Sequence, residues 1–227
     1  MDDREVFEAT LADAAQALDL RLNDEQRAGM WRHFTLMVEA NQQFNLTRIT
    51  TPADAAIKHY ADSLTLLATG WAERDAALNA LDVGTGAGFP AVPLAIICPT
   101  WRVTAIDGTG KKARFVAEAA SALGLANLNA IHARAADLSR QGGATFDLVI
   151  LRAVTKLGPG LEEVHRLVNA AGAIVFYKSG TCSGEELAAA EKIARRRGLS
   201  AAATHTLQLP SAEGPLERRL IRYARSR

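Results

Sequence analysis

A run of alternating glycines is the segment of this chain best suited to chemistry. It reads Asp82-Val83-Gly84-Thr85-Gly86-Ala87-Gly88-Phe89-Pro90 and begins at the end of an apolar stretch. Glycines at alternate positions allow a tight turn and let the backbone approach a ligand without a Cβ in the way. The run therefore predicts a nucleotide-like cofactor site between a strand and a helix. The alternative is a strand–helix turn that binds nothing.

The glycine spacing argues against two common nucleotide-binding loops. The dinucleotide fingerprint G-x-G-x-x-G needs its third glycine at position 89, which is Phe89 here. A second run, Gly108-Thr109-Gly110-Lys111-Lys112, lacks both the earlier glycine and the Ser or Thr after Lys111 that a phosphate loop requires. The form Asp-x-Gly-x-Gly-x-Gly instead resembles motif I of class I methyltransferases. This resemblance implies that Gly84 and Gly86 lie beside the methionine and ribose of S-adenosyl-L-methionine.

Asp107 ends the next apolar run, about 20 residues beyond the glycine loop. A carboxylate there can accept hydrogen bonds from both ribose hydroxyls, as it does in nicotinamide-binding units of this type. Asp107 thus supports ribose recognition without choosing between the two cofactors, and a helix cap is the alternative. By the same methyltransferase resemblance, the turn holding Ala135 and Ala136 meets the adenine, through backbone amides.

The segments that would position these residues alternate between short apolar runs and helical patterns from Ala77 onward. We expect strands over 78–83, 103–106, 128–131, 146–151 and 173–177, then roughly over 199–207 and 216–224, with helices over 91–98, 111–123, 157–169 and 184–197. Such alternation predicts an α/β fold with a Rossmann-like sheet of about seven strands and helices on both faces. We expect this cofactor-binding methyltransferase domain to span 77–227, behind a helical region over 1–76.

The N-terminal region shows apolar residues at helical spacing. They fall into three groups: Val6, Leu11, Ala14, Ala15 and Leu18; Met30, Trp31, Phe34, Met37 and Val38; and Ile57, Tyr60, Leu64 and Leu67. Asn23 or Asp24 can cap the second helix, and Thr51-Pro52 opens the third with proline in its first turn. All three stripes are predicted to face a core.

The composition indicates a globular protein. Of the 227 residues 48% are hydrophobic and 22% charged, and no apolar run reaches the roughly 18 residues of a membrane span. The acidic start of the chain is followed by no apolar segment of a signal peptide. Cys98 and Cys182 lie far apart, and the five histidines show no metal-ligand spacing. We therefore expect a cytoplasmic protein without membrane, disulfide or metal.

The net charge of +1 hides a basic end. Residues 191–227 contain nine Lys and Arg against three acids, including Arg195-Arg196-Arg197 and Arg218-Arg219. A basic stretch is a plausible footprint for a phosphate backbone. The alternative is a solvated helix face and a solvated strand.

Taken together, the motifs resemble the small-subunit (16S) rRNA guanine-N7 methyltransferase G family, also called the glucose-inhibited division protein B family. The matching segments, in order along nearly the whole chain, are Asn45-Leu46-Thr47, the Lys58–Leu64 stretch, Asp82–Pro90 with Pro93-Leu94-Ala95, Asp107 with Gly110–Phe115, Phe146-Asp147 with Arg152-Ala153-Val154, and Lys178. Ala91, Gly108 and Ala136 depart from the family pattern of Gly, Ser and Glu. The last departure puts a side-chain contact to adenine in doubt.

The resemblance implies cofactor contacts at Gly84, Phe89, Ala135, Ala136 and Arg152, with Asp107 as ribose partner. On the substrate side it points to a cluster of Lys58, His59, Asp62 and Ser63, joined by Lys178. At helical spacing Lys58 and Asp62 share one face, and His59 and Ser63 the adjoining one. A surface ion pair with a core histidine, and ordinary surface cations at 152 and 178, are the alternatives.

The family resemblance implies methyl transfer to N7 of a guanine in the 530 loop of 16S rRNA, within the 30S subunit near the decoding centre. Guanine N7 has a lone pair and no proton, so no general base is required and no catalytic residue is assigned. The rival interpretations are a methyltransferase with another RNA, protein or small-molecule acceptor, a nicotinamide oxidoreductase, and a non-catalytic RNA-binding scaffold.

Overall fold

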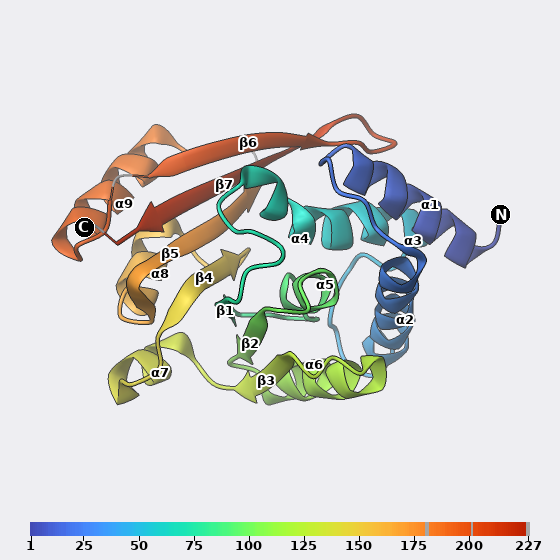
Figure 1. Ribbon diagram of the computed structural model, residues 1–227, viewed down its shortest axis with the longest axis horizontal. Helices are drawn as coiled ribbons and strands as arrows, with labels where there is room; N and C mark the ends of the chain where they lie inside the picture. The colour runs from blue at the N-terminus through green and yellow to red at the C-terminus, as the bar shows by residue number, and fades with distance from the viewer. Residues whose placement is uncertain (180–181, 201, 226–227) are drawn as a thin grey trace.

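The computed structural model describes residues 1–179, 182–200 and 202–225 (Figure 1). Within these described ranges, seven strands form one sheet in the order β3-β2-β1-β4-β5-β7-β6. They are β1 Asn79–Val83, β2 Arg102–Asp107, β3 Leu128–His132, β4 Phe146–Arg152, β5 Val168–Ser179, β6 Ala203–Leu209 and β7 Leu216–Ala224. Strands β1 to β5 run parallel, while β7 pairs antiparallel with both β5 and β6. The predicted α/β sheet is confirmed.

The central strands are apolar because both faces of the sheet are covered. In β1 the last four residues are buried, and in β4 four consecutive residues are buried, as expected for parallel strands between two helical layers. The register aligns Val83 with Ile106 and Leu151. The carboxyl ends of these strands therefore meet at one edge, which we call the carboxyl edge.

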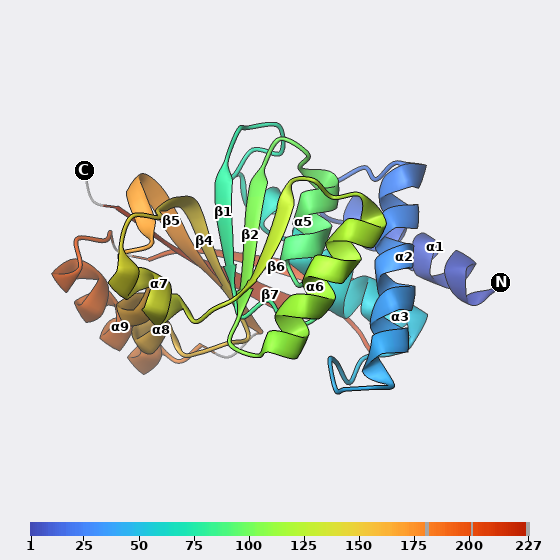
Figure 2. The same cartoon turned by 90° about the horizontal axis from the view of Figure 1, so that it is seen from below.

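Two helical layers enclose the sheet (Figures 1 and 2). On one face lie α5 Ala91–Ile97 and α6 Gly110–Leu123, and on the other lie α7 Ala135–Gln141, α8 Leu157–Val164 and α9 Gly184–Arg196. The helix α7 was not expected from the sequence. No helix among the described residues is both long and apolar enough to cross a bilayer.

The N-terminal helices pack on the α5 and α6 side and share one core with it. They are α1 Asp3–Gln16, α2 Asp24–Asn41 and α3 Pro52–Ala55, followed by the π-helix η1 Ala56–Ala61, α4 Asp62–Leu64 and the 3₁₀-helix η2 Leu67–Thr69. Of the two predicted caps, Asn23 is the one that caps α2, and it forms a capping box with Gln26. On α1, however, Phe7 is fully buried whereas Val6 is only half-buried. Phe7 takes the buried position because its ring packs edge-on against the ring of Tyr60, with the two ring centroids 5.0 Å apart.

Two further predictions of secondary structure were wrong at their boundaries. The helix expected over 157–169 ends at Val164, because the chain enters β5 at Val168, which pairs with Phe146 ahead of a register shift. The strand expected over 199–207 begins instead at Ala203, with an isolated bridge at Leu199. Residue 201 of that prediction lies outside the described residues.

Candidate cofactor and substrate site

The glycine loop leaves β1 at the carboxyl edge and turns into α5. Gly84 and Gly86 have φ of +72° and +60°, a region that residues with a Cβ rarely adopt. A Cβ on Gly84 would lie 2.6 Å from Cγ2 of Val154, whereas a Cβ on Gly86 would meet nothing within 4 Å. Gly84 is therefore required by close packing, and Gly86 borders open space.

Asp107 holds this loop from the end of β2. Its Oδ2 accepts the Gly86 amide at 3.0 Å and its Oδ1 accepts the Thr109 amide at 2.7 Å, just ahead of α6. The carboxylate therefore fixes both the glycine loop and the start of a helix. A carboxylate has about four acceptor sites, so two such bonds leave capacity for ribose hydroxyls.

Asp82 supports the loop from beneath. Its Oδ2 accepts the Ala91 amide at 3.2 Å, while its Oδ1 is buried and has no hydrogen-bond partner. Burial raises the pKa of this carboxyl to about 6. Asp82 therefore serves the loop as a buried support for the start of α5.

The loop forms one wall of a cavity of about 470 Å³, which we call the cofactor cavity. The predicted site residues that line it are Gly84, Gly86, Phe89, Asp107, His59 and Arg152; the sequence did not single out Leu46, Thr47, Lys112, Ala153 or Val154 as site residues. Its size suits a small-molecule ligand. Ala135 and Ala136, at the start of α7, are not among the described residues that line it, and Ala135 is buried in the core. Their contact with adenine stays a prediction.

His59 closes the cavity beside Phe89. The two rings stack with centroids 4.5 Å apart, and His59 Nε2 shares a hydrogen bond of 2.8 Å with Thr47 Oγ1. Thr47 is itself held by its amide, which donates to Asn41 Oδ1 at 3.0 Å. Burial, with the nearby charge of Arg152, lowers the pKa of His59 to about 4. The imidazole is therefore neutral near pH 7.

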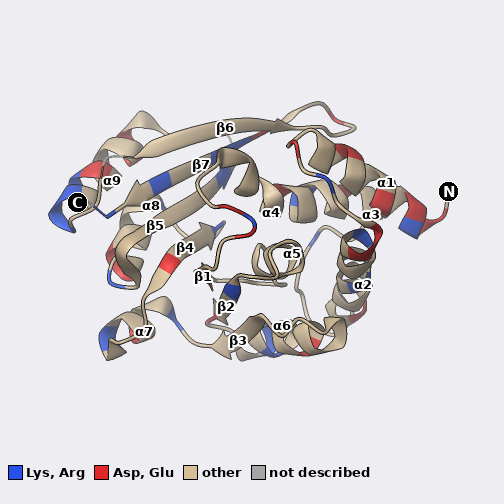
Figure 3. Cartoon of the chain, viewed as in Figure 1, with Lys and Arg blue, Asp and Glu red and all other residues tan. Residues whose placement is uncertain are grey.

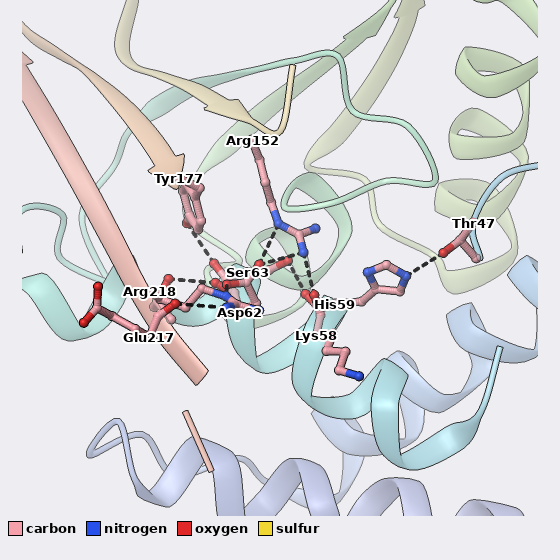
Figure 4. A network of polar contacts seen from close by, with 10 residues as sticks. Thr47, Lys58, His59, Asp62, Ser63, Arg152, Tyr177, Glu217 and Arg218 are labelled. Carbon is pink, nitrogen blue, oxygen red and sulfur yellow. Dashed lines mark hydrogen bonds and ion pairs between the residues drawn. The ribbon is translucent and has the colours of Figure 1, made fainter. Parts of the chain in front are cut away.

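Asp62 forms the centre of a buried ion network with Arg152 and Arg218 (Figure 4). Its Oδ2 accepts Arg152 Nε at 2.8 Å and its Oδ1 accepts Arg218 Nε at 2.6 Å. Arg152 Nη2 also donates to the Lys58 carbonyl at 2.6 Å. The exposed fractions of the three side chains are 7%, 15% and 17%. Arg152, predicted for the cofactor, thus joins residues predicted for the substrate.

Lys58 and Asp62 do not form the surface ion pair that was the alternative to a substrate role on their expected shared helix face. Lys58 Nζ instead lies 2.6 Å from Asp54 Oδ1. The segment between them is the π-helix η1, whose wider turn changes the side-chain spacing, and the carboxylate of Asp62 is taken by two arginines from the sheet. The shared face expected for His59 and Ser63 became a backbone contact, in which Ser63 Oγ donates to the His59 carbonyl at 2.6 Å. Substrate contact by Lys58 or Ser63 stays a prediction.

A second cavity of about 530 Å³ adjoins the first and shares Arg152, Ala153 and Val154 with it. We call it the basic cavity. Lys178 lines it and is held by Glu186 Oε1 at 3.1 Å and by the Thr155 carbonyl at 3.2 Å. The sequence placed Lys178 correctly at the carboxyl edge but gave no sign of its acidic partner.

The basic triplet Arg195–Arg197 lies at the C-terminal end of α9, with Arg197 as its C-cap, and α9 is at the opposite end of the molecule from α1 and α2 (Figures 1 and 3). Arg197 Nη2 is 2.6 Å and Arg196 Nη2 is 3.8 Å from Glu162 carboxylate oxygens, and Arg195 Nη2 is 3.4 Å from Glu191. Every member of the triplet therefore has an acidic partner. Across the described ranges, no three His, Cys, Asp or Glu side chains converge as a metal site.

Comparison with known proteins agrees with this geometry. The family model described as rRNA small subunit methyltransferase G matches residues 26–213. The ribosomal RNA small subunit methyltransferase G of Solibacter usitatus is 41% identical over 179 residues, covering 79% of this chain and 82% of that protein. The protein of the same name from Leuconostoc citreum is 33% identical, covering 92% and 86%.

Solved structures show the same fold at low sequence identity. The YcgJ protein of Bacillus subtilis superposes with a TM-score of 0.57 at 13% identity, covering 74% of this chain and 100% of that one. A SAM-dependent methyltransferase from Aquifex aeolicus gives 0.51 at 18% identity, covering 70% and 89%. The predicted methyltransferase fold is confirmed.

Proposed function

The chain belongs to the rRNA small subunit methyltransferase G family, and from that premise we propose that it transfers the methyl group of S-adenosylmethionine to N7 of a guanine in the 530 loop of 16S rRNA, near the decoding centre. The observation that carries the proposal is the cofactor cavity between the glycine loop, Asp107 and His59, directly beside a cavity rich in cations. The first suits the methyl donor and the second suits RNA.

The residues of the cofactor cavity fit S-adenosylmethionine. Gly86 borders open space where a side chain would intrude, and Asp107 is fixed by two backbone amides with acceptor capacity to spare. Gly84, Gly86 and Phe89 would hold the methionine and sulfur region, Asp107 the ribose, and Arg152 the carboxylate. When bound, the cofactor supplies an electrophilic methyl group on a sulfonium.

The neighbouring side chains support a reaction without a general base. Guanine N7 carries a lone pair and no proton, so the protein has to orient the base and tolerate the positive charge that passes to it. His59 is neutral near pH 7 because burial lowers its pKa to about 4. A neutral imidazole stacked on Phe89 adds no positive charge beside the purine.

We infer further that the substrate is 16S rRNA in the 30S subunit and that the protein acts in the cytoplasm, where ribosomes assemble. Support for an RNA substrate comes from the names of the relatives and from the cationic lining of the basic cavity. A net charge of +1 is low for an RNA-binding protein. Recognition therefore relies on a local site and on shape.

The deciding experiment is transfer of radiolabelled methyl groups to purified undermethylated 30S subunits, compared with naked 16S rRNA and with bulk protein. We expect label at guanine N7 in the rRNA, with a single-turnover rate that is flat between about pH 6.5 and 8.5, since neither N7 nor His59 titrates there. Label on protein alone, or a steep rise with pH that His59→Gln removes, would overturn the proposal.

A further inference from the structure

We propose that the basic cavity is a subsite for a backbone phosphate of the RNA substrate, with Arg219 as its main ligand. The inference rests on the proposed function, because it assumes that the acceptor is a nucleotide presented to the cofactor cavity. It assigns a specific task to β7, a strand at the far end of the chain from the glycine loop.

The position of the cavity is the first argument. Arg152, Ala153 and Val154 form a common wall between the two cavities. A nucleotide whose base is presented to the cofactor beside this wall would therefore have its sugar–phosphate next to the basic cavity. The opposite wall of the basic cavity comes from β5 and β7, where Lys178 and Arg219 are paired in the sheet.

The charge of the cavity is the second argument. Among the described residues that line it are five cations (Arg152, Lys156, Lys178, Arg218 and Arg219) and one acid, Asp62. Asp62 accepts both Arg152 and Arg218, and one carboxylate cannot neutralise two guanidinium groups. The network therefore keeps a net positive charge in a mostly buried place, where screening by salt is weak.

Among the described cations that line the cavity and are at least partly buried, Arg219 has the weakest compensation by an acid. Its Nε is buried without a hydrogen-bond partner, and its Nη2 lies 3.5 Å from Glu217 Oε1, a long contact to a carboxylate that is 40% exposed. Buried donors are normally satisfied, so this guanidinium is left with incomplete hydrogen bonding, while its side chain is still 26% exposed. An arginine presents its donors in a planar fork that suits phosphate.

Lys178 and Arg218 prepare the subsite. Lys178 is held by Glu186 and the Thr155 carbonyl, and Arg218 by Asp62 and, through Nη1, by the Glu217 carbonyl at 3.0 Å. Because these side chains are already ordered, binding a phosphate beside them costs little side-chain entropy. Arg219 then adds the direct contact.

The test compares Arg219→Gln with Arg219→Lys and with a matched control, Arg102→Gln. Arg102 is exposed and begins β2, at the end of the sheet opposite to the carboxyl edge. The three readouts are affinity for S-adenosylmethionine by calorimetry, salt dependence of binding to labelled undermethylated 30S subunits, and single-turnover methyl transfer to them. Urea unfolding checks that each variant is folded.

We expect Arg219→Gln to keep cofactor affinity, to lower RNA affinity roughly tenfold, and to reduce the log–log salt slope by about 0.7 to 0.9. Arg219→Lys should restore most of the slope, and Arg102→Gln should leave all three readouts near wild type. If Arg219→Gln and Arg102→Gln lower RNA affinity and the salt slope equally, only the overall charge of the protein matters, and the proposed subsite is overturned. A loss of cofactor affinity in Arg219→Gln would assign the cavity to the cofactor and also overturn it. If wild-type protein methylates neither undermethylated 30S subunits nor naked 16S rRNA, the proposed function itself fails.

Discussion

Two clusters of arginine lie in different parts of this molecule and are built in opposite ways. At the carboxyl edge, Arg152 and Arg218 share a single carboxylate, Asp62, and all three side chains are at most 17% exposed. At the C-terminal end of α9, Arg196 and Arg197 also share one carboxylate, Glu162 on α8, but the arginines are 71% and 41% exposed. The second cluster can be recognised in the sequence as a run of three arginines, whereas the residues of the first cluster are far apart in the sequence.

The difference shows that a run of basic residues in the sequence is not the same as a buried group of charges that can form a binding site. Exposed pairs are weak because water and salt screen them. Buried pairs are held firmly, and removing one partner leaves a desolvated charge behind. We therefore assign specific recognition to the carboxyl edge, and at most a diffuse electrostatic role to α9.

The largest expected effect comes from breaking the shared carboxylate in each cluster. Asp62→Asn keeps the shape but leaves two buried guanidinium groups without a counter-charge, and we expect a loss of about 3–5 kcal/mol in the free energy of unfolding. Glu162→Gln, the matched change on α8 that removes the carboxylate shared by Arg196 and Arg197, should cost no more than about 1 kcal/mol. Urea unfolding of both variants measures this. Equal losses would show that the two clusters are energetically alike.

A second pair of variants separates cofactor binding from backbone strain. Gly86 and Gly198 have φ of +60° and +68°, so valine strains either position, but only Gly86 lines the cofactor cavity. Gly198 follows α9. We expect Gly86→Val to lower affinity for S-adenosylmethionine at least about 100-fold, equivalent to about 2.7 kcal/mol, and Gly198→Val to leave it unchanged. Calorimetry on folded protein is the measurement, and unchanged affinity at position 86 would refute the cofactor site.

We expect the loss of folding stability at low pH to originate from two histidines in the half of the molecule that contains the cofactor cavity. Burial lowers the pKa of His33 to about 3 and of His59 to about 4. Below pH 6.5 these imidazoles are protonated in the unfolded chain but stay neutral in the native protein. The free energy of unfolding therefore falls as the pH falls. Between pH 6.5 and 5 each histidine should cost about 2 kcal/mol. Asp82, whose pKa burial raises to about 6, partly opposes this trend.

Urea unfolding between pH 7.5 and 5 tests this prediction. His33→Gln should remove about one proton from the slope of unfolding free energy against pH, whatever its effect on stability at pH 7.5. His59→Gln should do the same. An unchanged slope in both variants would mean that other groups cause the acid sensitivity.

The smallest effect is expected from the exposed triplet. Replacing Arg195, Arg196 and Arg197 together by Gln removes three charges that already face Glu162 and Glu191. We expect the log–log salt slope of rRNA binding to change by less than about one unit, far below three full phosphate contacts. A change of two units or more would show that the arginines at the end of α9 contact RNA phosphates, and it would contradict the assignment of RNA recognition to the carboxyl edge.

The sequence by itself determined the features that depend on neighbours along the chain. Alternating glycines required a turn with positive φ, apolar runs between helical patterns required a parallel sheet, and Asp107 at the end of a run had to reach the carboxyl edge. These predictions held because local backbone geometry and burial on two faces follow from residue type and spacing. The ends of α8 and β5 were less predictable, since their apolar residues suit either structure.

Only the tertiary structure decided which charges meet. Helical spacing placed Lys58 on the same face as Asp62, four residues away, with an ion pair between them as the alternative, but Asp62 binds Arg152 and Arg218, 90 and 156 residues away. No sequence pattern encodes such a pair, because it exists only after β4 and β7 have brought their side chains to the helix that follows η1. Burial then selects arginine, whose several donors can satisfy a desolvated carboxylate, over a lysine that can remain in water beside Asp54.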